Sequence, residues 1–351
     1  MAYHTTPYLL LFLPAALLFY QITPAKWRSY TLLIFSYLFF WSFSEKLIIY
    51  LIGTTFLTHY ICIWMDTMDK RDKRKKRVFQ LGILLLLGTI LCLKYRNFFF
   101  GNVSKLAMVL HIDWSYQDQL IFLPIGISFY TLSAIGYMAD VYWGKVKAEY
   151  SLVKTALFLG FFPVIVEGPI CRWEDVEDTL FKNESVKAEN VFKGCYRIIW
   201  GLFKKMIIAD RLAVLVDKVY VGYESYSGAV IVAAAISYTI QLYMEFSGCM
   251  DMVIGSAGLF GIRLPENFSQ PFFAKTCTDF WKRWHITLGV WFKNYIFYPV
   301  SISKTARKWN KFTRKHFKGD FGKYVARMGI AAMALFPVWI SNGLWHGPKW
   351  N

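Results

Sequence analysis

Eight long, almost uncharged blocks constrain the fold of this chain more than any other feature of its sequence. The first four hold 15–19 residues each, near the lower end of the length at which an apolar helix crosses a bilayer. Four such blocks would fit the buried helices of a soluble protein, but eight in one chain indicate a polytopic membrane protein. The blocks comprise residues 7–22, 29–43, 47–65, 78–93, 119–142, 152–170, 229–262 and 324–346. The sequence therefore predicts an all-α polytopic membrane protein.

The basic residues lie in short stretches between these blocks. The chain carries 40 Lys and Arg against 23 Asp and Glu, a net charge of +17, and such a balance raises the question of nucleic acid. Basic loops on the cytoplasmic side of membrane spans explain the clusters better, and no nucleic-acid partner is expected. We expect residues 66–77, residues 304–323 and the Lys26–Arg28 turn in the cytoplasm. Counting spans from there puts the N-terminus and the acidic loop 171–193 outside.

The six cysteines form no metal or redox motif, since no two of them have the C-x-x-C spacing. No metal site is therefore expected. Neither a low-complexity linker nor an obvious internal repeat divides the chain. Residues 1–351 are accordingly expected to form a single integral-membrane domain.

Two carboxylates interrupt the apolar stretch QLYMEFSGCMDMVIG, residues 241–255. A charge at the centre of a span costs about 2.5–3.5 kcal/mol on insertion scales, so it normally faces a protein interior or a water-filled cavity. Glu245 and Asp251 can therefore form a polar wall of an internal cavity. The alternative is a short interfacial turn between two helices, with both carboxylates in water.

The stretch TDFWKRWHITLGVWFKNYIFYP, residues 278–299, mixes charges and aromatic rings. Asp279 precedes Arg283 by four residues, the spacing of a helical ion pair, and Trp281 and His285 share one face of the same helix. The segment is too charged to cross lipid as a plain helix and too aromatic for a solvated loop. It fits a re-entrant or interfacial segment buried in protein. An aromatic belt with Lys and Arg extending to the interface is the alternative.

A histidine ends the last apolar block, in the sequence NGLWHG at residues 342–347. A helix from about Tyr324 would rise about 33 Å, roughly one bilayer, before it reaches His346. A neutral imidazole in that place can take a proton from a hydroxyl, because its pKa lies near working pH. An interfacial histidine beside belt tryptophans is the alternative interpretation.

Six stretches, in order along the chain, resemble motifs of the membrane-bound O-acyltransferase (MBOAT) family. The chain is most similar to the alginate O-acetylation branch, and teichoic-acid D-alanyl transfer proteins are related to it. Glu245 stands where the family usually has Asp. The stretches are FLPIGISFYTLSAIGYMADVYWG (122–144), FFPVIVEGPICRW (161–173), MEFSGCMDMVIG (244–255), GIRLPENFSQPFF (261–273), DFWKRWHITLGVWFKNYIFYP (279–299) and GLWHG (343–347).

The resemblance implies an MBOAT-type helical bundle with re-entrant segments around a tunnel. It matches the family's catalytic histidine to His346 and a second catalytic histidine to His285. Further side chains are expected to line the substrate tunnel. They are Glu245, Asp251, Arg283, Trp284, Asn342 and Trp345.

The implied reaction moves an acyl group, expected to be acetyl, from a cytoplasmic thioester donor across the membrane, toward a hydroxyl of a cell-surface or cell-wall polysaccharide. The donor, acetyl-CoA or an acyl carrier protein, is a substrate, and no bound cofactor is expected. An extracytoplasmic esterase-like transferase is the expected partner. Three alternatives stay open: D-alanyl transfer to teichoic acid, an inactive scaffold, and a transporter, although the matching halves typical of transporters are missing from the sequence.

One departure from the family concerns length. Family members usually continue for many tens of residues past the histidine that matches His346, and this sequence ends at Asn351. The resemblance therefore implies that the C-terminal spans of the domain are missing, which leaves open whether this chain is active by itself.

Overall fold

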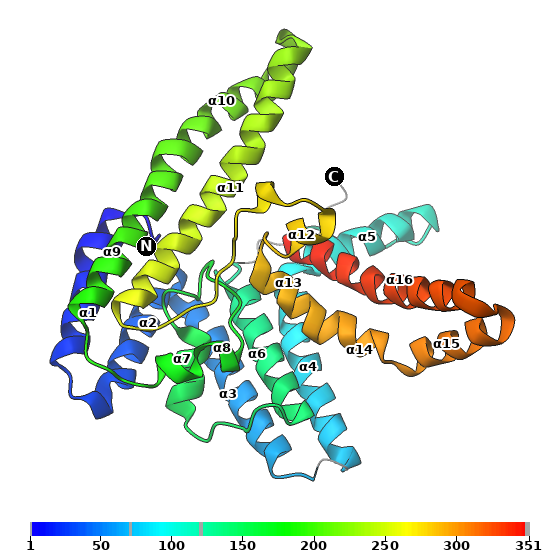
Figure 1. Ribbon diagram of the computed structural model, residues 1–351, viewed down its shortest axis with the longest axis horizontal. Coiled ribbons are helices and arrows are strands. Elements are labelled where there is room, and N and C mark those ends of the chain that lie inside the picture. Colours follow the sequence, from blue (N-terminus) through cyan, green and yellow to red (C-terminus); the bar gives the residue numbers. More distant parts are fainter. Residues whose placement is uncertain (1, 70–71, 119–121, 348–351) are drawn as a thin grey trace. The chain divides into compact units, whose positions relative to one another are not determined.

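Helices joined by turns and irregular segments make up the structure, a computed structural model that describes residues 2–69, 72–118 and 122–347 (Figure 1). Within these residues the sheet-like pairing is one isolated bridge between Phe268 and Trp284. The prediction of an all-α fold is confirmed. The chain divides into two compact units. Unit 1 comprises residues 1–75 and 124–287, and unit 2 comprises residues 76–123 and 288–351.

Unit 1 contains the first three long helices and the long helical pair in the middle of the chain. Its helices are α1 (Leu13–Ile22, preceded by the π-helical turns η1, Pro7–Phe12), α2 (Arg28–Ser44), α3 (Ile48–Asp66), α6 (Ile127–Trp143), α7 (Leu152–Gly160), α8 (Trp173–Leu180), α9 (Ala188–Leu202), η4 (Phe203–Ala209), α10 (Asp210–Val221), α11 (Gly228–Leu259) and α12 (Cys277–Trp281).

Unit 2 contains most of the fourth helix and the C-terminal helices. They are α4 (Lys73–Lys94), α5 (Arg96–Val109), α13 (Ile286–Phe292), η7 (Lys293–Phe297), α14 (Tyr298–Ser301), α15 (Lys304–His316) and α16 (Gly319–His346). Helices α4 and α13 each begin within unit 1 by the residue bounds of the two units.

Seven of the eight apolar blocks form helices over most of their length, as predicted from their composition. Among the described residues, four segments are long and apolar enough to cross a membrane. The first of them is divided into α2 and α3 by a break at Glu45, whose φ is 41°. The four are Ala25–Asp66, Lys73–Lys94, Gly228–Leu259 and Gly319–His346, and the shorter apolar helix is Pro7–Ile22.

The block at residues 152–170 is the exception, because its helix α7 ends at Gly160. Beyond it the chain is irregular, and Gly168 approaches the backbone so closely that a Cβ there would lie 2.4 Å from the Cα of Val164. The far part of the segment reaches the middle of α2, where the Phe162 amide donates to Ser36 Oγ (3.1 Å). This block therefore does not form one helix over its whole length, although the count of spans in the sequence treated it as a full crossing.

This segment returns to the end of unit 1 from which it starts. Tyr137 contacts the chain both before and after this segment. Its hydroxyl accepts from the Glu149 amide (2.7 Å), and its ring stacks on Trp173 at 4.8 Å between centroids. Glu149 lies before the segment and Trp173 follows it. We call residues 152–172 the re-entrant segment.

The acidic loop after the re-entrant segment lies at the turn between α1 and α2. Arg28 Nη1 donates to the Asn183 carbonyl (2.9 Å), Ser29 Oγ donates to Asn183 Oδ1 (2.8 Å), and the Tyr20 hydroxyl donates to the Glu184 carbonyl (3.0 Å). The turn and the loop therefore share one end of unit 1. The prediction that they lie on opposite sides of the membrane is wrong, because it counted the re-entrant segment as a full span.

Four glycines bring the backbones of α9 and α11 together. Gly194 and Gly201 in α9 are seven residues apart, as are Gly248 and Gly255 in α11. A Cβ at Gly201 would lie 2.5 Å from the Gly248 carbonyl oxygen, and one at Gly194 would lie 2.8 Å from that of Gly255. Small residues at such positions allow close helix packing in membranes. Figure 1 shows α9 and α10 following α11 along most of its length.

Candidate active site

Asn267 is the centre of a buried hydrogen-bond network in unit 1, which we call the Asn267 hub. Its side chain is fully buried. The Oδ1 atom meets three groups: His285 Nδ1 at 3.1 Å, the Thr287 amide at 3.1 Å and Thr287 Oγ1 at 3.0 Å. Its Nδ2 atom donates to Met250 Sδ (3.3 Å). Both ends of the amide are thus hydrogen-bonded, as a buried amide requires.

His285 lies at a break between helices. Helix α12 ends at Trp281 and α13 begins at Ile286, and His285 between them has a φ of 45°. A side chain in this left-handed region costs about 1–3 kcal/mol and persists where surrounding contacts hold it. The expected common helix face of Trp281 and His285 is therefore wrong: Trp281 is 50% exposed and His285 is 8% exposed.

Backbone hydrogen bonds hold the chain on both sides of His285. The Ser269 amide donates to the Arg283 carbonyl (3.0 Å), and the Ile286 amide donates to the Asn267 carbonyl (2.9 Å). The loop after α11 thus runs alongside the break and fixes its backbone. This pairing explains how the strained conformation of His285 is maintained.

Four of the six motif stretches found in the sequence meet at the Asn267 hub. Asn267 comes from 261–273, and His285 and Thr287 come from 279–299. The re-entrant segment joins through the Ile170 amide, which donates to Thr287 Oγ1 (3.1 Å). Helix α11 joins through Met250 and through the ring of Phe246, which packs edge-on against His285 at 4.9 Å.

Trp284 belongs to an aromatic cluster beside the hub. Its ring lies 5.2 Å from Phe268, edge to face, and stacks on Phe280 at 5.7 Å between centroids. Next to it, Arg283 Nε donates to Asp279 Oδ1 at 2.9 Å. The predicted ion pair at this spacing is confirmed.

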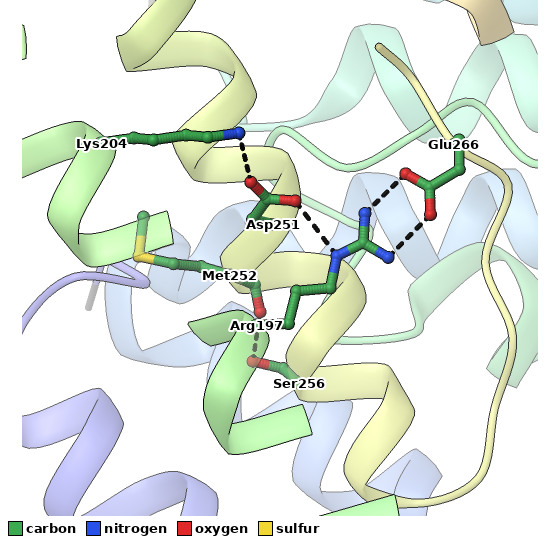
Figure 2. Close-up of polar contacts among 6 residues, drawn as sticks. All are labelled: Arg197, Lys204, Asp251, Met252, Ser256 and Glu266. Carbon is green, nitrogen blue, oxygen red and sulfur yellow. Dashed lines mark hydrogen bonds and ion pairs between the residues drawn. The ribbon is translucent and has the colours of Figure 1, made fainter. Parts of the chain in front are cut away.

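Asp251 lies in an ion cluster with Arg197, Lys204 and Glu266 (Figure 2). Arg197 Nε donates to Asp251 Oδ1 (3.1 Å), and Lys204 Nζ donates to Oδ2 (2.7 Å). The other two guanidinium nitrogens of Arg197 donate to the carboxylate of Glu266 at 2.7 and 2.5 Å. Because Glu266 directly precedes Asn267, the cluster ties α9 and α11 to the loop that carries the hub.

Glu245 also pairs with a cation from the neighbouring element. Its Oε1 lies 2.7 Å from the Nζ of Lys205 in η4. Residues 241–255 lie within the continuous helix α11, so the interpretation of this stretch as an interfacial turn is wrong. Both carboxylates are partners in pairs between helical elements, and their place in the wall of a tunnel stays a prediction.

An open groove of about 630 Å³ lies in unit 1 at the end that holds the α1–α2 turn. Arg197 and Glu266 of the ion cluster form part of its wall. The lysines of its rim are engaged by carboxylates: Lys182 and Lys187 hold the pKa of Glu184 at about 2. The groove therefore presents ion pairs more than unpaired positive charge.

His346 is the last residue of α16 in unit 2, and its side chain is exposed. The end of this helix is held by the junction of α4 and α5. Lys94 Nζ donates to the Trp345 carbonyl (2.7 Å), and the Tyr95 hydroxyl donates to the Leu344 carbonyl (2.5 Å). The ammonium also lies 5.6 Å from the Trp345 ring centroid. A cation at a helix C-terminus is favourable because the last carbonyls lack partners in the helix.

Asn342 lies one turn before His346 in α16 and is half-buried. The structure thus describes His285 within unit 1 and Asn342, Trp345 and His346 within unit 2. That the two histidines line one cavity stays a prediction.

Sequence reasoning missed five residues that the structure brings into the network. Arg197 and Lys204 each follow a glycine of the α9–α11 contact by three residues, and this spacing was a usable signal. The other three lie within two of the motif stretches, but nothing in the local sequence singled them out there, because their contacts join distant parts of the chain. The five are Arg197, Lys204, Glu266, Asn267 and Thr287.

Residues 145–314 match the family model of the membrane-bound O-acyltransferases. The chain is 31% identical to the probable alginate O-acetylase AlgI of Pseudomonas putida over 351 residues, all of this chain and 67% of the relative. The AlgI protein of Pseudomonas aeruginosa is also 31% identical, with 63% of it covered. The chain thus spans about two thirds of the length of these relatives.

Two relatives have other names. The peptidoglycan O-acetyltransferase of Helicobacter pylori is 28% identical, with 99% of this chain and 67% of the relative covered. The teichoic acid D-alanyltransferase of Bacillus subtilis is 28% identical over 64% of this chain and 53% of its own length. The region that matches the family model contains the Asn267 hub and the ion cluster and ends before His346.

Proposed function

This chain belongs to the membrane-bound O-acyltransferase family, and on that premise we propose that it transfers an acetyl group from a cytoplasmic thioester across the membrane, toward a hydroxyl of a cell-surface or cell-wall polysaccharide. It is a multi-pass membrane protein, as its apolar helices and its family agree. The observation that carries the proposal is the meeting of four motif stretches around one buried histidine, His285, in the region that matches the family.

The proposed reaction needs no covalent enzyme intermediate, because a thioester is already activated. The acceptor oxygen attacks the thioester carbonyl carbon while an imidazole removes the hydroxyl proton. The carbon–sulfur bond then breaks, and the departing thiolate takes up a proton. A positioned general base contributes about 10²–10⁴-fold, and alignment of the two substrates contributes up to about 7–11 kcal/mol. The site must also exclude water, since hydrolysis competes.

We assign the general base to His346 and a second role in the proton chemistry to His285. Glu245, Asp251, Arg283, Trp284, Asn342 and Trp345 are proposed to line the substrate tunnel. In this scheme the ion cluster holds α9, α11 and the hub loop in register, so that the walls around His285 keep their shape.

The donor is proposed to be acetyl-CoA or an acyl carrier protein, used as a substrate from the cytoplasm. Both carry anionic groups, which basic cytoplasmic loops attract. The acceptor is proposed to be an extracytoplasmic glycan, and an esterase-like transferase outside the membrane to take the acetyl group onward. The relatives named for alginate and peptidoglycan O-acetylation support a glycan. D-alanyl transfer to teichoic acid is the second candidate, supported by a relative that covers less of this chain.

The test of the base assignment is His346→Ala in the complete gene product. We expect acetylation of the surface glycan to fall by about 10²–10⁴-fold, because the base is lost. The protein level should change little, since the imidazole is exposed and fills no core space. His4→Ala is the matched control, because His4 is another exposed histidine, outside the motif stretches. Normal acetylation in the His346 variant would refute its role as base.

A further inference from the structure

The hydrogen bonds of the Asn267 hub determine which atom of the amide faces His285. The Thr287 backbone N–H can only donate, and it lies 3.1 Å from Oδ1. If the NH₂ group of Asn267 occupied that place, two hydrogen-bond donors would face each other. The Nδ2 atom, in turn, has its own acceptor in Met250 Sδ. The carbonyl oxygen of Asn267 is therefore the atom that His285 meets.

The same accounting holds for the hydroxyl of Thr287. It accepts from the Ile170 amide at 3.1 Å and donates its own proton to Asn267 Oδ1 at 3.0 Å. The Thr287 hydroxyl therefore acts as acceptor toward Ile170 and as donor toward Asn267, which agrees with Oδ1 of Asn267 being an acceptor. With Asn267 fully buried and His285 8% exposed, bulk water does not compete for these bonds.

It follows that His285 Nδ1 must carry a proton, because it lies 3.1 Å from an oxygen that can only accept. A neutral imidazole has one N–H, so its lone pair is then on Nε2. We propose that Asn267 is the positioning residue that fixes His285 in the Nδ1–H tautomer and so presents Nε2 as a proton acceptor in the acyl transfer. This inference rests on the proposed function.

An amide suits this role better than a carboxylate would. A buried carboxylate beside the ring would favour the charged imidazolium, which has no lone pair to accept a proton. A neutral carbonyl oxygen orients the ring without that bias. The left-handed backbone of His285 adds a second constraint, because the pairing of Ile286 with the Asn267 backbone carbonyl holds the ring against Oδ1.

The test is ¹⁵N NMR of the complete protein in lipid nanodiscs, labelled at histidine, at about pH 8.5, where an ordinary imidazole is neutral. The His285 signals are assigned by their loss in His285→Gln. We expect a protonated Nδ1 and an unprotonated Nε2. A wild-type spectrum with the proton on Nε2 would overturn the inference, and this result is read from the wild-type protein itself.

Three variants sharpen the test. Asn267→Leu keeps the branching at Cγ but has no acceptor, and it should move the proton of His285 toward Nε2. Asn267→Asp restores an acceptor oxygen and should keep Nδ1 protonated. Thr287→Val removes one hydroxyl of the hub but leaves the contact between Asn267 and His285, so it should keep the wild-type tautomer. An unchanged tautomer in folded Asn267→Leu would contradict the role of Asn267.

Activity separates this inference from the proposed function on which it rests. In glycan acetylation assays, Asn267→Leu should lower kcat by about 10²–10⁴-fold, the loss that follows from a wrong tautomer or a lost base, with little change in KM. Full activity in His285→Gln would refute the catalytic role of His285, whatever its tautomer. Loss of activity in His285→Gln together with an Nε2–H wild type would refute only the role of Asn267.

Discussion

Asp251 lies in an apolar helix and is 9% exposed, so desolvation of its carboxylate must be offset. Arg197 and Lys204 both contact it, and Arg197 also holds Glu266. The cluster therefore joins three segments through one guanidinium. Removal of the central carboxylate would leave two cations close together with a single remaining partner.

Asp251→Asn is expected to destabilise the protein by about 3 kcal/mol. This lies at the lower end of the range for breaking a buried ion pair, because Arg197 keeps its bonds to Glu266. Asp320→Asn is the control: its partner Lys323 is also exposed, and such pairs contribute about 0–1 kcal/mol. Thermal unfolding in detergent measures both. If both variants changed the free energy of unfolding by equally small amounts, the ion cluster would not stabilise the contact between these segments.

The glycines between α9 and α11 determine how closely the elements that carry the ion cluster can approach. Arg197 lies three residues after Gly194, and Lys204 lies three residues after Gly201. The two cations therefore occupy equivalent positions relative to the two glycines, and both contact Asp251. A wider helix spacing would separate these charges from their partner.

Gly201→Ala should destabilise the helix pair by about 1–3 kcal/mol, the usual effect of overpacking. Its Cβ would lie 2.5 Å from the Gly248 carbonyl oxygen, a backbone atom that cannot move aside alone. Gly258→Ala, in the same helix pair, meets nothing within 4 Å and should be neutral or stabilising. Unfolding temperatures of the two variants give the comparison. A neutral Gly201→Ala would show that the helices do not pack so closely.

Most helices could be predicted from the sequence. The prediction failed for one apolar segment whose hydropathy is typical of a membrane span but whose chain turns back. The composition of α2 and α11 is sufficient to identify them as long apolar helices. Residues 152–170 have a similar composition, but α7 ends at Gly160 and the chain turns back near Gly168. Hydropathy reflects the free energy of burying a segment in an apolar environment. It does not distinguish a segment that crosses the membrane from one that enters and returns to the same side.

The candidate site was predictable only in part, for a related reason. His285 and Asp251 stood out as polar residues in apolar surroundings. Asn267 and Thr287 did not, because ordinary polar residues in a loop and a helix start carry no periodic signal. The hub depends on contacts such as that between Ile170 and Thr287, which are 117 residues apart in sequence.

For the whole molecule, the re-entrant segment changes the expected membrane topology. The loop that holds Asn183 contacts the turn between α1 and α2, so both belong to one side. The basic Lys26–Arg28 turn is expected in the cytoplasm. Residues 182–187 should therefore be cytoplasmic as well.

Single cysteines at Lys26 and Lys182, in a background without other cysteines, test this topology. Both positions are exposed and should react with a membrane-impermeant maleimide only after the cytoplasmic face is opened. Tyr20 and Asn183 need no change, so the contact between turn and loop is kept. Labelling of position 182 from outside intact cells would refute the shared side.

The central claim is that the motifs converge on His285 to support acyl transfer. Its most direct test is the rate at which membranes containing the complete protein move labelled acetyl from a thioester donor to the surface glycan. His285→Gln should lower this rate by about 10²-fold or more, because a group that handles the proton is lost, while Asn267 and the ion cluster keep the fold. An unchanged rate in a folded His285→Gln protein would contradict the account.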